Sequence, residues 1–69
     1  MVEVFKTNVQ HRELAEQLAS ILRDQFAFCK INFDLEDCDK ILRVEGKQIC
    51  VEMIIEILGI HGLECEVLT

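Results

Sequence analysis

The 69-residue sequence predicts an α+β domain in which two helices cover one face of a four-stranded antiparallel sheet. Two observations support this fold class. Some segments alternate apolar and polar residues, as half-buried strands do, and others repeat apolar residues every three or four positions, as amphipathic helices do. These two patterns follow one another along the chain in the order β-α-β-β-α-β.

The first half of the chain predicts a strand, a helix and a second strand. Residues 2–6 indicate a short strand, and residues 10–25 follow helical spacing. Residues 28–35 show the clearest alternation, which predicts a strand with one buried face and one wet face. The apolar stripe of the helix consists of Leu14, Leu18, Ile21 and Leu22.

The second half repeats the same order. Residues 36–39 form a polar turn, and residues 40–45 predict a strand that ends at a glycine. Residues 48–60 are so rich in apolar residues over such a length that a helix of about three turns is favoured over a strand. Residues 63–67 alternate again and predict the last strand.

Two strand-helix-strand halves, each with a right-handed crossover, produce a ferredoxin-like βαββαβ fold with both helices on one side of the sheet. We expect one such domain over residues 1–69. Ile31 and Leu42 are expected to face the helices. Phe5 and Ile41 are expected on the two central strands at the opposite face, where they would form a small exposed apolar patch.

The charge balance excludes several functions. Seven basic and thirteen acidic residues give a net charge of −6, which argues against binding to nucleic acid or to an anionic membrane. No apolar run is long enough to span a bilayer, and the first residues do not resemble a signal peptide. We therefore expect a cytoplasmic protein whose cysteines are reduced thiols.

Catalytic motifs are missing from the sequence. It contains no glycine-rich phosphate loop, no Gly-x-Ser-x-Gly and no His-Glu-x-x-His. We therefore expect that the protein is not an enzyme and needs no cofactor.

Two stretches resemble the heavy-metal-associated domain family, whose members are small copper or zinc chaperones and modules of metal-transporting ATPases. They are residues 30–36, similar to the second strand of that family, and residues 54–68, similar to its closing helix and acidic strand. The resemblance implies the ferredoxin-like fold. The family binds metal through a Cys-x-x-Cys motif where the first loop meets the first helix, and His11 and Leu14 lie at those positions here. We therefore carry over the fold but not the metal ligands.

Weak metal candidates remain. One is His11 alone, for which a solvated side chain is the simpler interpretation. The other is a set formed by Cys50, His61 and Cys65, which would need deprotonated thiols that converge on one ion. The alternation of the last strand points Cys65 into the core, so metal binding is not expected.

The second helix has more apolar residues than one core-facing stripe requires. Met53, Ile57 and Ile60 follow helical spacing on a different face from the residues expected to pack on the sheet. Exposed apolar patches of this kind mark association surfaces. The sequence therefore predicts an intracellular protein-interaction or regulatory module that forms a homodimer or binds a protein partner.

Two alternatives stay open. The first is a divergent metal carrier, in which His11 and nearby carboxylates bind a harder ion. The second is a regulatory domain that senses a small molecule near the first loop, at the edge of a dimer.

Overall fold

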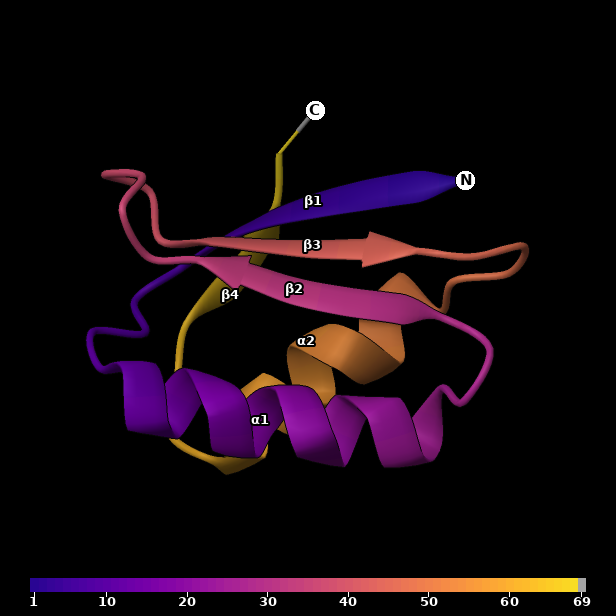
Figure 1. Cartoon of the computed structure of the whole chain (residues 1–69), viewed down its shortest axis with the longest axis horizontal. Helices are drawn as coiled ribbons and strands as arrows, with labels where there is room; N and C mark the ends of the chain where they lie inside the picture. The colour runs from indigo at the N-terminus through magenta and orange to yellow at the C-terminus, as the bar shows by residue number, and fades with distance from the viewer. Residues whose placement is uncertain (69) are drawn as a thin grey trace.

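The computed structural model describes residues 1–68 and confirms the expected order of elements. They are β1 (Val2–Thr7), α1 (Arg12–Gln25), β2 (Lys30–Asp34), β3 (Ile41–Glu45), α2 (Val51–Ile60) and β4 (Cys65–Val67). The strands form one antiparallel sheet in the order β2-β3-β1-β4. Both helices lie on one face of this sheet (Figure 1), so the ferredoxin-like fold class is confirmed.

The core lies between the sheet and the helices. Ala19 and Leu22 of α1 and Ile54 and Leu58 of α2 pack against the inner face of β1, β2 and β3. A smaller cluster under the start of α1 consists of Val9, Ala15 and Leu18. Side chains one or two helical turns apart share a face of a helix, which explains why these positions meet the sheet together.

The expected exposed patch of Phe5 and Ile41 does not form. Phe5 is paired with Leu42 of β3 and is completely buried in the core, so the prediction that it is exposed is wrong. Paired residues of antiparallel strands project to the same face, and Leu42 projects toward the helices. Ile41 does lie on the open face, between its cross-strand partners Lys6 and Asp34, but it is only 9% exposed.

Several element boundaries differ from the sequence prediction by one to three residues, and those of β2 and α2 matter most for the surface described below. The strand expected from residue 28 begins at Lys30, because a turn in which the Cys29 N–H donates to the Phe26 carbonyl precedes it. Phe28 therefore lies in a loop. The helix expected from residue 48 begins at Val51, with Cys50 as its N-cap. Within residues 1–68, neither helix combines the length and the apolar composition needed to cross a bilayer.

Candidate interaction surface

The outer side of the helical layer carries the largest apolar side chains that α2 exposes. Met53 is 43% exposed and Ile60 is 74% exposed, as the sequence predicted for this stripe. Ile57, the third member, is half-buried because it also packs against the core. Ile21 of α1 adjoins them, and together they line a shallow groove of about 280 Å³ between the helices. We call this surface the helical groove.

The rim of the helical groove is polar. Gln25 of α1 and Glu56 of α2 line it beside the apolar residues, and His61 lines its end. An apolar floor with a polar rim is the usual composition of a protein-interaction site. A carboxylate on the rim of a protein with a net charge of −6 favours a partner that carries basic residues.

A second apolar feature was missed by the sequence analysis. Phe28 is fully exposed at the tip of the loop between α1 and β2, beside a hollow of about 780 Å³ that Phe26 and Cys29 help to line. The sequence analysis assigned Phe28 to a strand, because the alternation of residues 29–35 extends back to it. Only the turn at residues 26–29 places this aromatic ring in solvent.

The loop between β1 and α1 is held by hydrogen bonds rather than prepared for a ligand. The Thr7 hydroxyl donates to the Lys40 carbonyl at 2.6 Å and accepts from the Val9 N–H at 3.2 Å. The Asn8 side chain accepts from the Glu64 N–H at 2.9 Å, which ties the loop to the segment before β4. His11 follows as the exposed N-cap of α1 and makes no side-chain capping bond.

The set formed by Cys50, His61 and Cys65 cannot share one metal ion. Cys50 and His61 are the two caps of α2, whose ten residues separate them by about 15 Å at 1.5 Å per residue. Cys65 lies on β4, where burial raises the pKa of its thiol from 9.0 to about 11. The same burial disfavours the thiolate, which is the form that zinc and copper bind.

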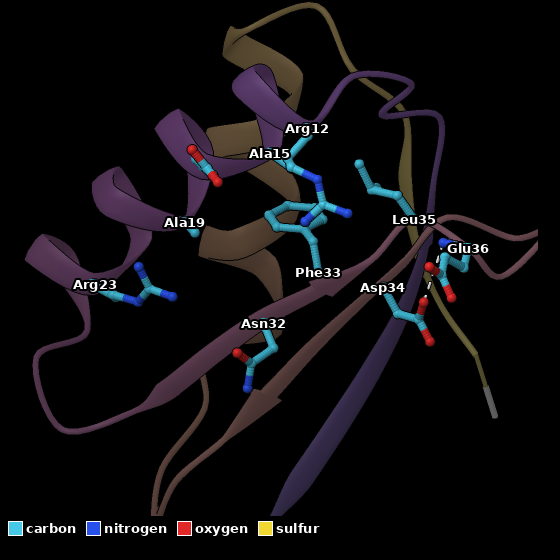
Figure 2. Close-up of a pocket in the computed structure, with 10 residues that line it drawn as sticks. Arg12, Ala15, Ala19, Arg23, Asn32, Phe33, Asp34, Leu35 and Glu36 are labelled. Atoms are coloured by element: carbon cyan, nitrogen blue, oxygen red, sulfur yellow. Dashed lines mark hydrogen bonds between the residues drawn. The ribbon is translucent and has the colours of Figure 1, made fainter.

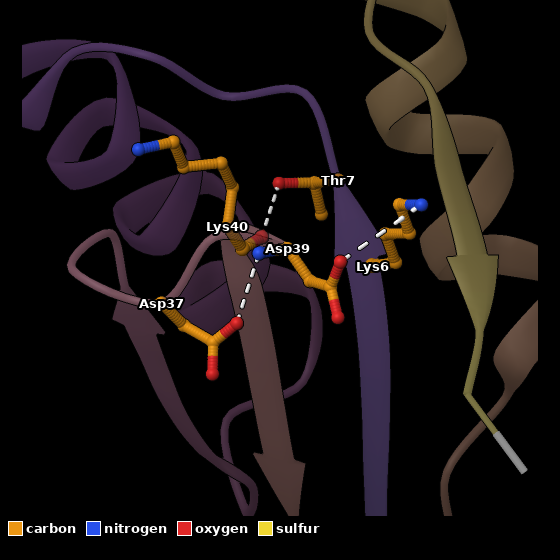
Figure 3. Close-up of polar contacts among 5 residues, drawn as sticks. All are labelled: Lys6, Thr7, Asp37, Asp39 and Lys40. Atoms are coloured by element: carbon orange, nitrogen blue, oxygen red, sulfur yellow. Dashed lines mark hydrogen bonds and ion pairs between the residues drawn. The ribbon is translucent and has the colours of Figure 1, made fainter.

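Among the described residues, one group of potential ligands is compact. The ligand atoms of Asp37, Cys38 and Asp39 lie within 4.8 Å of one another in the turn between β2 and β3. Figure 3 shows that these carboxylates already have partners: Asp37 accepts from the Asp39 N–H at 2.8 Å, and Asp39 is paired with Lys6 at 3.9 Å. The cluster is therefore explained by the chemistry of the turn itself.

A cleft of about 290 Å³ separates α1 from β2 (Figure 2). Two small residues of α1, Ala15 and Ala19, leave room above Phe33 of β2. Arg12 and Arg23 line the cleft along α1, and the Arg23 guanidinium donates to the Ile31 carbonyl at 2.9 Å. The sequence alone does not bring these residues together, since their proximity depends on how α1 crosses the sheet.

Comparison with known proteins identifies the fold but not a family. No protein-family model matches the chain, and no curated protein matches its sequence. One solved structure with the same fold is the yeast copper transporter domain CCC2A, determined in solution in its apo and Cu(I)-loaded states. The two agree with a TM-score of 0.82 over 99% of this chain and 94% of that domain, at 17% sequence identity. The likeness at this identity establishes the ferredoxin-like fold alone.

Proposed function

We propose that this protein is a non-enzymatic interaction module of the heavy-metal-associated type that binds a protein partner through its helical groove. The observation that carries the proposal is the exposure of Met53 and Ile60 beside the half-buried Ile57 and Ile21. A helix of a monomeric domain normally shows one apolar stripe toward its core. Here α2 buries Ile54 and Leu58 on the core side and carries a second apolar stripe toward the groove.

The groove suits an amphipathic helix. Such a helix inserts apolar side chains at positions i, i+3, i+4 and i+7 into a hydrophobic groove. Basic side chains on its flanks would approach Glu56 on the rim, and the net charge of −6 would speed their encounter. A cytoplasmic location belongs to this proposal, and the four free thiols support it.

Site-specific photocrosslinking in the source cells tests the proposal. A photoreactive amino acid at position 60 should give one crosslinked adduct of defined mass, and the same residue at position 43 should not. Arg43 is the matched control because it is exposed on the open face of the sheet, away from the helices.

The partner found in this way is then purified and titrated with the chain. Because exposed apolar anchors dominate such interfaces, Met53→Glu should weaken binding by a factor of about ten or more. Gln17→Glu adds the same charge at an exposed position of α1 outside the groove and should change affinity little. Equal affinities for the two variants, or equal crosslinking at positions 43 and 60, would contradict the proposal.

A second candidate function is a divergent metal carrier, which the likeness to a copper-transporter domain favours. Its candidate ligands are His11, the exposed N-cap of α1, and the carboxylate of Glu13 in the first turn of that helix. This function requires one equivalent of a metal ion such as Zn²⁺ per chain, because an imidazole and a carboxylate suit harder ions than Cu(I).

Titration followed by mass spectrometry separates the two functions. Loss of the metal in His11→Ala, but not in the control His61→Ala, would establish the carrier. The interaction module predicts no stoichiometric metal. Small-molecule sensing stays a prediction that a thermal-shift screen with amino acids would examine.

A further inference from the structure

β2 is an edge strand, and the hydrogen-bond pattern of the sheet shows which of its residues direct their N–H and C=O groups away from β3. The Gly46 N–H donates to the Met1 carbonyl at 3.0 Å, so the backbone groups of residue 46, directly after β3, point toward β1. Hydrogen-bonding direction alternates along an antiparallel strand. The groups of Val44 therefore also point toward β1, and those of Arg43 point toward β2.

The same pattern shows which backbone groups of β2 point outward from the sheet. Asn32 is paired with Arg43 and directs its N–H and C=O into the sheet. Ile31 and Phe33, on either side of it, direct theirs outward. The bond from Arg23 to the Ile31 carbonyl agrees with this assignment, since α1 reaches that oxygen from outside the sheet. Ile31 is 2% exposed and its carbonyl is bonded to Arg23, so this edge becomes a template for another strand only when that side chain moves away.

We propose that this edge pairs with the β2 edge of a second copy of the chain, antiparallel and centred on Asn32. In this register Ile31 lies opposite Phe33 of the second copy, and both residues have outward backbone groups that can exchange hydrogen bonds. Lys30 lies opposite Asp34 of the second copy on the open face, and symmetry repeats that pair. Opposite charges directly across antiparallel strands stabilise the pairing.

The resulting dimer forms a continuous eight-stranded sheet. A two-fold axis perpendicular to the sheet relates antiparallel copies of one strand, so the helices of both copies lie on the same face. The two α1 helices then approach across the cleft of Figure 2, whose exposed residues on α1 are Arg12, Glu16 and Arg23. Both helical grooves would face one side, so a partner with two binding segments would gain avidity.

Arg23 acts against this pairing, because its bond to the Ile31 carbonyl occupies an acceptor that the second copy needs. The dimer requires Arg23 to release that oxygen. Arg23→Ala should therefore strengthen association.

Sedimentation equilibrium of the full chain at 0.15 M salt tests the pairing through reversed charges. Lys30→Asp places two carboxylates opposite each other, and Asp34→Lys places two ammonium groups opposite each other. Each reversal should weaken the dimer by a factor of about ten to thirty, because two symmetric pairs change from attractive to repulsive. The double variant Lys30→Asp/Asp34→Lys restores complementary charges and should dimerise nearly as well as the wild type.

The matched control for Lys30→Asp is Lys6→Asp, which makes the same change in net charge on β1, two strands away from β2. It should leave the dimer intact, and thermal unfolding of every variant confirms that it folds. A wild-type chain that stays monomeric at 500 µM would overturn the proposal. So would single reversals that dimerise like the wild type, or a double variant no better than the singles. The pairing goes beyond the proposed function and does not use the helical groove, so Met53→Glu should leave it unchanged.

Discussion

Replacing Phe5 by leucine tests which face of β1 belongs to the core. The structure buries Phe5 completely, against Leu42 and beneath both helices. Leucine is smaller and leaves part of the ring's volume unfilled, which costs about 1 to 1.5 kcal/mol in a well-packed core. One kcal/mol lowers the melting temperature of a domain of this size by about 4 to 8 °C. Phe5→Leu should therefore lower the melting temperature by roughly 4 to 12 °C.

Thermal unfolding followed by far-ultraviolet circular dichroism measures this shift. Val2→Ala on the same strand is the control, because Val2 is 51% exposed and its loss should change the melting temperature by less than about 2 °C. Phe5→Ala should cost about 3 to 5 kcal/mol. That cost is comparable to the whole stability expected of a 69-residue domain, about 3 to 10 kcal/mol, so this variant should be largely unfolded. A Phe5→Leu protein with the melting temperature of the wild type would refute the assignment of Phe5 to the buried face of β1.

Three further substitutions examine other contacts. Gly46→Ala places a Cβ 2.6 Å from the Cys29 sulfur and should lower the free energy of unfolding in urea by about 1 to 3 kcal/mol. Adding Cys29→Ala should recover much of that free energy. If the double variant recovers none of it, this clash is not the cause. Thr7→Val leaves the buried Val9 N–H without its acceptor and should cost about 1 to 3 kcal/mol, whereas wild-type stability would show that the bond is unimportant. The Cys65 thiol keeps its proton to about pH 11 when folded but only to about 9 when unfolded, so unfolding free energy should fall as pH rises through that range. That fall should be smaller in Cys65→Ala, and equal pH profiles would contradict the assigned burial.

The order of elements was predictable because each pattern has a direct physical cause. Alternation in residues 30–35 reflects a strand with one buried face, and the spacing of Leu18 and Leu22 reflects one buried side of α1. The face of β1 was not predictable in the same way. Val2 and Val4 support one alternation, whereas Phe5 and Thr7 support the other, and only pairing with β3 decides between them.

The candidate site was predictable only where it depends on one helix. Met53, Ile57 and Ile60 share a face of α2 through spacing alone, and the structure exposes two of them as expected. The contribution of Ile21 depends on how α1 lies beside α2, which no local pattern encodes. Cys50, His61 and Cys65 do not form a metal site, because the length of α2 separates Cys50 from His61. Composition alone made them a plausible ligand set and carries no information on that distance.

The central claim is that this domain, which has the fold of a copper-transporter domain, works through the apolar helical groove and not through a bound metal. Native mass spectrometry of the chain purified under reducing conditions from its source cells tests it most directly. The account predicts a metal-free chain in complex with a protein partner, and loss of that partner in Met53→Glu. A chain that carries one copper or zinc ion, and keeps it in Met53→Glu but loses it in His11→Ala, would contradict the account.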